Sequence, residues 1–226
     1  MTTSPASCAD DELNELVRAN LDDIRQRIRA TGRTLESVRI VAVTKTFGPP
    51  AVRAAAAAGL ESVGENYVRE LLEKRAATPD LKLSWHYLGV LQTNKMNRLA
   101  TSADVLCGVS RVKELDFLAA HGVVATLYVQ VDFTGLPGRH GALPNQASLL
   151  VKRARELGLS IRGLMTVAPP DVAGAREAFR ATRALADELG VAERSMGMSD
   201  DLELACQYGT SEIRVGRALF GPRGAR

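Results

Sequence analysis

The residue with the clearest chemical potential is Lys45, which follows a run of mostly apolar, β-branched residues. That run, residues 38–43, reads VRIVAV and is typical of a strand buried on both faces of a sheet. Gly48, Pro49 and Pro50 then interrupt the pattern. A lysine at this point is either an ordinary surface lysine or an amine held to form an imine with a carbonyl cofactor.

Two further segments offer groups that bind phosphate. Residues 195–201, SMGMSDD, combine hydroxyls and a glycine with the start of a helix, whose free N–H groups attract anions. Residues 214–217, RVGR, offer a second glycine and another pair of N–H groups. The simpler interpretations are a helix cap at Ser199 or Asp200 and a strand-ending turn at Gly216. Together with a strand-end lysine, the two segments favour a phosphate cradle.

The elements that must position these groups alternate between strands and helices. Strands are expected at residues 38–43, 62–65, 83–89, 104–109, 123–131, 160–166, 195–198 and 212–216. Helices are expected at residues 51–58, 66–77, 94–100, 112–120, 144–157, 172–189 and 200–208. This alternation predicts a single-domain (β/α)₈ TIM barrel, an α/β fold. A doubly wound open sheet usually has fewer strands and a glycine-rich turn after the first.

An amphipathic helix over residues 10–30 precedes the first strand. Few residues follow the eighth strand, so we expect this helix to pack in the place of a full last helix. The expected domain organisation is a disordered tail at residues 1–9 and one barrel domain at residues 10–226.

In such a barrel the site is formed at the C-terminal ends of the strands. The ends expected here carry polar residues and glycines: Lys45, residues 64–66, residues 86–89, Thr166, residues 195–199 and residues 214–217. Their convergence favours a functional role for Lys45.

Composition narrows the classes of protein. The formal net charge is +3, the basic residues are scattered, and aromatic residues make up 4% of the 226 residues, which gives no support for nucleic-acid binding. Three cysteines without CxxC spacing suit a reducing compartment. No secretory leader and no apolar stretch of about 18 residues is visible. We expect a cytoplasmic protein that binds neither nucleic acid nor membrane.

Six motifs resemble those of the YggS-type pyridoxal phosphate homeostasis proteins, and they extend over most of the chain. They are residues 41–45 (VAVTK), 64–68 (GENYV), 85–95 (WHYLGVLQTNK), 163–166 (GLMT), 195–201 (SMGMSDD) and 214–221 (RVGRALFG). That family shares the barrel of bacterial alanine racemase. The resemblance implies that the cofactor is pyridoxal 5'-phosphate (PLP).

The resemblance also implies roles for individual residues. Lys45 is expected to form the Schiff base with PLP, and Arg214 to face the pyridine nitrogen. The phosphate is expected to contact Ser199, Gly216 and the backbone of Arg217, with Ser195 and Met198 in the same wall. Asn66 and His86 fall in motifs near the cofactor, and His86 has the alternative of a hydrogen-bonded structural histidine. No residue is assigned to catalysis or to a metal.

The expected function is to hold PLP as an internal aldimine on Lys45, in vitamin B6 homeostasis and amino-acid balance. A charged Arg214 beside the pyridine nitrogen disfavours its protonation and weakens the ring as an electron sink. Racemisation also needs an acid–base group on each face of the substrate, which alanine racemase completes from another domain. We therefore expect a monomeric carrier, with apo PLP-dependent enzymes as candidate recipients.

Two alternatives remain open, a PLP-dependent amino-acid racemase with weak activity and a phosphosugar enzyme that uses Lys45 as a Schiff-base lysine. The loop at residues 131–141, VDFTGLPGRHG, departs from the family pattern. Arg139 stands where a lysine is usual, and a guanidinium cannot act as an amine nucleophile. We therefore interpret this segment as a surface loop.

Overall fold

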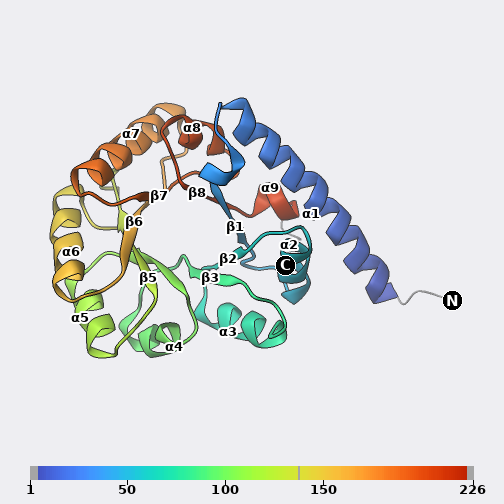
Figure 1. Ribbon diagram of the computed structural model, residues 1–226, viewed down its shortest axis with the longest axis horizontal. Coiled ribbons are helices and arrows are strands. Elements are labelled where there is room, and N and C mark those ends of the chain that lie inside the picture. Colours follow the sequence, from blue (N-terminus) through green and yellow to red (C-terminus); the bar gives the residue numbers. More distant parts are fainter. Residues whose placement is uncertain (1–4, 137, 223–226) are drawn as a thin grey trace.

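The structure, a computed structural model, describes residues 5–136 and 138–222 (Figure 1). Parallel strands close into a barrel in sequence order, with the last strand paired to the first. They are β1 (Arg39–Val43), β2 (Ser62–Glu65), β3 (Ser84–Tyr87), β4 (Val105–Val109), β5 (Thr126–Val131), β6 (Ile161–Thr166), β7 (Glu193–Ser195) and β8 (Glu212–Val215). The predicted (β/α)₈ barrel is confirmed.

Helices surround the barrel on its outer side (Figure 1). They are α1 (Pro5–Ala30), α2 (Pro49–Ala57), α3 (Val68–Ala77), α4 (Met96–Ala100), α5 (Val112–Ala120), α6 (Pro144–Glu156), α7 (Val172–Glu188), α8 (Leu202–Gln207) and α9 (Arg217–Phe220), with short 3₁₀ turns η1 (Leu35–Ser37) and η2 (Thr93–Lys95). Among the described residues, none of these helices combines the length and the apolar character that crossing a membrane requires.

The strands are buried because they face the barrel interior on one side and the helices on the other. In β1, Val41 and Ala42 are fully buried, and in β8 so are Ile213 and Val215. Parallel strands covered on both faces are apolar almost throughout, which explains the pattern seen in the sequence.

Helix α1 lies along the gap between α8 and α2, beside the short α9 (Figure 1). Its buried stripe of Val17, Leu21, Ile24 and Ile28 is at most 1% exposed. The Asn20 side-chain amide donates to the Leu219 carbonyl of α9 over 2.9 Å. The helix therefore occupies the place where a full last helix would pack, as the sequence predicts.

Several expected boundaries are wrong by a few residues, and the shifts at α1 and β7 are among the largest. Helix α1 begins at Pro5, so residues 5–9 are helical rather than part of a disordered tail, and residues 1–4 lie outside the described residues. Proline is tolerated in the first turn of a helix because the N–H it lacks has no intrahelical partner there. Strand β7 ends at Ser195 instead of covering residues 195–198, because the chain turns at Gly197, which has φ of 98°.

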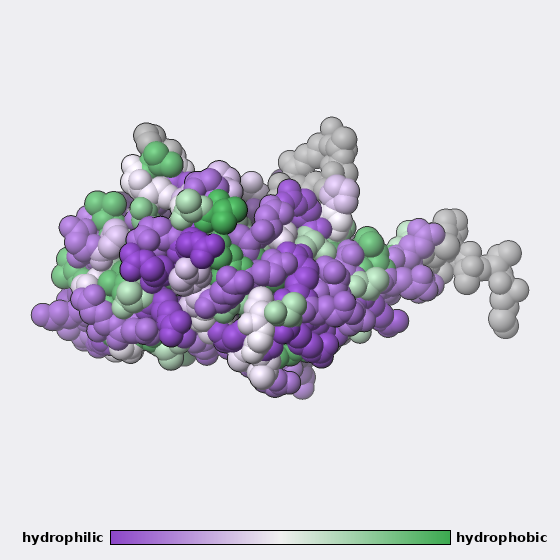
Figure 2. All heavy atoms as spheres, turned by 90° about the horizontal axis from the view of Figure 1, so that it is seen from above, coloured by the Kyte–Doolittle hydropathy of each residue, from purple (hydrophilic) through white to green (hydrophobic). Residues whose placement is uncertain are grey.

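The exposed surface carries scattered large apolar side chains. Within the described residues they are Leu16, Tyr67, Val124, Leu136, Leu143, Leu149, Val172 and Met198. On the face seen in Figure 2, hydrophilic residues predominate and hydrophobic ones occur in small separate groups. Isolated apolar residues of this kind are normal on a protein surface.

The packing of α1 predicts a large difference between two substitutions on that helix. Ile24→Ala should lower the free energy of unfolding by about 2–5 kcal/mol, because it leaves a cavity under a fully buried side chain. Leu16→Ala, at a position 43% exposed, should change it far less. Urea denaturation followed by circular dichroism measures both. Equal effects would contradict the assignment of α1 to the core.

Candidate functional site

A pocket of about 590 Å³ opens at the C-terminal ends of the barrel strands. It is formed by residues that follow β1, β2, β3, β6, β7 and β8, together with the last residues of some of those strands. The lining residues are Val43, Lys45, Phe47, Asn66, Leu88, Met165, Val167, Met198, Ser199, Asp200, Arg214, Gly216, Arg217 and Pro222. The structure thus brings together seven of the nine residues expected at the site.

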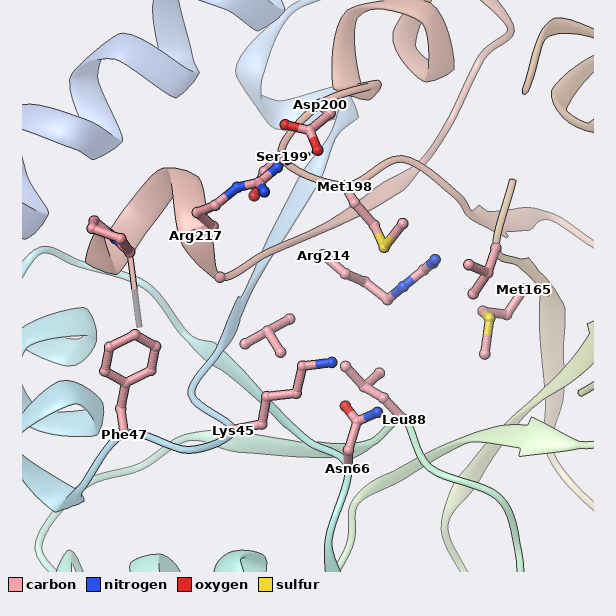
Figure 3. Close-up of a pocket in the computed structure, with 14 residues that line it drawn as sticks. Lys45, Phe47, Asn66, Leu88, Met165, Met198, Ser199, Asp200, Arg214 and Arg217 are labelled. Atoms are coloured by element: carbon pink, nitrogen blue, oxygen red, sulfur yellow. Dashed lines mark hydrogen bonds and ion pairs between the residues drawn. The ribbon is translucent and has the colours of Figure 1, made fainter. Parts of the chain in front are cut away.

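Lys45 enters the pocket from the end of β1. Its half-buried side chain extends inward, between Asn66 on one side and Arg214 on the other (Figure 3). The amine therefore faces the interior of the pocket, as expected for a lysine that binds a ligand there.

The loops after β7 and β8 form a polar wall of the pocket. The Ala218 N–H donates to Ser199 Oγ over 3.0 Å, which ties the two loops together. The Arg217 guanidinium donates to the Asp200 carboxylate at the edge of this wall (Figure 3). A hydroxyl, a guanidinium and backbone N–H groups on one wall are the donors that a phosphate group requires.

Glycines allow the close packing of this wall. A Cβ on Gly197 would lie 2.6 Å from the Ala205 Cβ, and the φ of 98° is one that other residues rarely adopt. A Cβ on Gly216 would lie 3.1 Å from the Val43 carbonyl oxygen of β1. Gly216 therefore lets the turn after β8 approach the strand that carries Lys45.

Arg214 is a buried cation held by three hydrogen bonds. Its Nη1 donates to the Ser195 carbonyl over 2.6 Å and to Ser195 Oγ over 2.8 Å, and its Nη2 donates to the Thr166 carbonyl over 2.7 Å. Burial lowers the pKa of Arg214, but a guanidinium stays charged in proteins. The contacts fix where this charge faces the pocket.

Ser195 and His86 lie in the barrel interior and are not among the pocket-lining residues. Ser195 is fully buried and donates to Glu212 Oε1 over 2.6 Å, so it links Glu212 to Arg214. His86 is 1% exposed, its Nδ1 lies 3.7 Å from Glu212 Oε2, and burial lowers its pKa. Their positions place both residues beneath the pocket, and the expected contact of each with the cofactor stays a prediction.

His86, Cys107 and Glu212 place a nitrogen, a sulfur and an oxygen within 4.8 Å of one another. Glu212 is already paired with Arg39 over 3.2 Å and with the Ser195 hydroxyl. Burial also raises the pKa of the Cys107 thiol, which disfavours the thiolate that a metal ion needs. We therefore interpret the set as part of the interior polar network.

The sequence did not single out the apolar side of the pocket. Phe47, Leu88, Met165 and Val167 line it, and the ring of Phe47 lies 5.1 Å from that of Phe220 in α9. Leu88 falls within residues 86–89, one of the strand ends expected at the site, and Met165 directly precedes Thr166, another of these ends. Their strand-end positions were therefore the signal that could have found them.

Comparison with known proteins places the chain in a family. The family described as "Alanine racemase, N-terminal domain" matches residues 19–224. The pyridoxal phosphate homeostasis protein of Pseudomonas aeruginosa is 37% identical over 209 residues, which cover 88% of this chain and 91% of that protein. This chain belongs to the pyridoxal phosphate homeostasis protein family. Another family member, from Deinococcus radiodurans, is 36% identical over 216 residues, covering 90% of this chain and 99% of that protein.

Solved structures of this family have the same fold. PipY of Synechococcus elongatus, with PLP bound, superimposes with a TM-score of 0.79 and 34% identity, covering 91% of this chain and all of PipY. An alanine racemase from Streptomyces lavendulae gives a TM-score of 0.73 with 24% identity, and the match covers 92% of this chain and 57% of that enzyme. The second likeness concerns the fold alone.

Arg139 is the point where this chain departs from the pattern expected for the family. Its Nη1 points toward the Val167 and Ala168 carbonyls after β6, at 3.4 Å from each. The side chain is thus directed to the backbone beside the pocket, and it is not among the residues that line the pocket holding Lys45.

Helix α1 is connected to the Ser199 loop by Arg27. Its guanidinium donates to both carboxylate oxygens of Glu203, over 2.6 and 3.0 Å, and to the Ser199 carbonyl over 2.9 Å. Hydrogen bonds from Arg27 hold the pKa of Glu203 below its usual value. The N-terminal helix therefore supports the polar wall of the pocket.

This ion pair predicts a pH dependence of stability. The pKa of Glu203 is lower in the folded state than in the unfolded state. Its contribution to the free energy of unfolding is therefore fully present above the unfolded-state pKa of about 4.3 and is lost as the pH falls through the folded-state pKa. Glu203→Gln should therefore be less stable than the natural protein at pH 7, and the difference should shrink at acidic pH. Denaturation at a series of pH values measures it.

The matched control for this series is Glu177→Gln, which removes the exposed pair with Arg180 on α7. Exposed pairs contribute little, so its effect at pH 7 should be small. A Glu203→Gln difference that stays constant down to acidic pH would show that Arg27 does not act through the ionised carboxylate.

Proposed function

We propose that this protein binds PLP in the pocket at the strand ends and holds it covalently through Lys45. The single observation that carries the proposal is that the Lys45 amine and the polar wall of Ser199, Gly216 and Arg217 belong to one pocket of about 590 Å³. Support also comes from the relatives, which are named pyridoxal phosphate homeostasis proteins, and from PipY with PLP bound.

The donor set of the pocket suits this cofactor, whose aldehyde reacts with primary amines. The Lys45 nitrogen would form a C=N bond to the aldehyde carbon, and the aldehyde oxygen would leave as water. Ser199, Gly216 and the backbone N–H of Arg217 at the start of α9 would bind the phosphate, while the Arg217 guanidinium is paired with Asp200. Asn66 would lie beside the lysine.

Arg214 would face the ring nitrogen and keep it unprotonated. Hydrogen bonds to the Ser195 and Thr166 carbonyls hold its guanidinium, so the positive charge stays fixed toward the pocket. A neutral pyridine is a poor acceptor of electrons. The residues around the pocket thus favour retention of the cofactor over its use in carbanion chemistry.

We infer a role in vitamin B6 homeostasis and amino-acid balance rather than in racemisation. A racemase needs acid–base groups on both faces of its substrate. Among the described lining residues, Lys45 is one such group, and Asp200 is engaged by Arg217 at the polar wall. Apolar residues, Leu88, Met165 and Val167 among them, make up much of the remaining lining.

We further propose a cytoplasmic monomer that passes PLP to apo PLP-dependent enzymes. The buried free thiols of Cys107 and Cys206 suit a reducing compartment. The mainly hydrophilic face in Figure 2 suits a chain that does not assemble through that face.

Substitution of Lys45 tests the covalent attachment. The purified natural protein, loaded with PLP and freed of excess cofactor, should show a visible absorption band. Lys45→Ala should lose the band, because no amine remains at the site, whereas Lys152→Ala, on the exposed face of α6, should keep it. An unchanged band in Lys45→Ala would show that the cofactor is attached elsewhere.

Incubation with L-alanine tests the choice between carrier and racemase. The PLP-loaded protein should form D-alanine far more slowly than an ordinary enzyme, for which turnover is about 1 to 10³ per second. Chiral chromatography of the amino acid measures the rate. Turnover within the enzyme range would support the racemase alternative instead.

A further inference from the structure

Beneath Lys45 lies an ionic cluster made of the buried Glu65 and Lys74 and the partly exposed Glu70. The Lys74 side chain is 5% exposed, and its Nζ lies 2.7 Å from Glu65 Oε1 and 2.8 Å from Glu70 Oε2. Glu65 ends β2, while Glu70 and Lys74 are one turn apart on α3. Burying charges is costly unless they are paired. Lys74 pairs with both carboxyl groups, while the second oxygen of Glu65, Oε2, is buried without a hydrogen-bond partner among the described residues.

The cluster holds the residue before Lys45. Lys74 Nζ donates to the Thr44 carbonyl over 2.7 Å, and Thr44 Oγ1 donates to Glu65 Oε1 over 2.5 Å. Both the backbone and the side chain of Thr44 are therefore fixed by the cluster. The hydrogen bond from the Lys74 ammonium group is stronger than one between neutral groups, while burial raises the pKa of the Glu65 carboxyl.

The same cluster holds the residue after Lys45. The Thr46 N–H donates to Glu70 Oε2 over 2.7 Å. Thr46 has φ of 70°, and among the described residues no other non-glycine residue has a positive φ. A β-branched residue rarely adopts this conformation, which persists only where surrounding contacts enforce it. The hydrogen bond to Glu70 is one contact that holds Thr46 in this conformation.

Glu70 is ionised under ordinary conditions. Although partial burial opposes it, the hydrogen bonds from Lys74 and Thr46 lower the pKa of this carboxyl. Its negative charge therefore bridges a buried ammonium group and a strained backbone N–H.

We propose that Glu65, Glu70 and Lys74 form a positioning clamp for Lys45. The clamp fixes the backbone on both sides of Lys45 and thereby aims its amine into the pocket. The inference rests on the proposed function, because the position of the amine matters only if that amine reacts. Small misplacements of reacting groups can slow a reaction about a hundredfold.

Glu70→Ala is the variant of choice for the test. It removes the acceptor of the Thr46 N–H while leaving the Lys74–Glu65 pair in place, and the Glu70 side chain is 22% exposed, so the chain should still fold. Glu73→Ala is the matched control, because Glu73 lies on the same helix and pairs only with the exposed Arg69 among the described residues. Glu70→Gln keeps an oxygen acceptor for Thr46 and tests rescue.

Two quantities separate positioning from general damage to the pocket. The first is the rate at which the visible band appears after PLP is mixed with each protein at a temperature where circular dichroism shows all of them folded. The second is the affinity for pyridoxine 5'-phosphate, which has an alcohol in place of the aldehyde and cannot bond to Lys45.

The clamp predicts that Glu70→Ala slows attachment about tenfold or more. The affinity of Glu70→Ala for pyridoxine 5'-phosphate should stay close to that of the natural protein. Glu73→Ala should match the natural protein in both the attachment rate and this affinity. Glu70→Gln should recover part of the attachment rate. The clamp alone would be overturned if Glu70→Ala attached PLP at the natural rate. It would also be overturned if the attachment rate and the affinity for pyridoxine 5'-phosphate fell by the same factor. A natural protein that attaches no PLP would instead overturn the proposed function and the clamp with it.

Discussion

The parallel pairing of β1 with β8 is the constraint on which the site depends. Val41 of β1 lies opposite Arg214, and Ala42 opposite Val215, although these residues are more than 170 positions apart in the chain. Closure of the barrel thus brings the lysine after one strand to the glycine and guanidinium groups of the other. Gly216 makes the approach close, because a side chain there would press on the Val43 carbonyl.

Beneath this pairing, buried polar groups keep the pocket residues in place. Glu212, Ser195 and Arg214 form a chain of short hydrogen bonds below one side of the pocket, and Glu65, Glu70 and Lys74 form another below Lys45. Removal of one partner from such a network leaves a buried charge without its partner. Polar side chains therefore replace part of the apolar core, and they hold the basic side chains of Lys45 and Arg214 in place.

Most of the fold and much of the site could be predicted because they depend on local patterns. Apolar β-branched runs mark the strands, and the residue that follows each run must lie at the same end of the barrel, which is why Lys45, Asn66, Ser199 and Gly216 meet. His86 and Ser195 could not be separated from these by sequence. Both are polar residues at strand ends, and only the closed barrel shows that their side chains face its interior.

The clamp was invisible for a different reason. Glu70 and Lys74 read as an ordinary surface pair four residues apart on a helix, and nothing local indicates that Glu65 or the backbone of Thr46 meets them. The most direct test of PLP binding through Lys45 is a crystal structure of the protein soaked with PLP. Covalent attachment at Lys45 predicts continuous electron density from the Lys45 amine to the ring, with the phosphate between Ser199 and the start of α9. Density for the ring elsewhere, or in the pocket without a bond to Lys45, would contradict it.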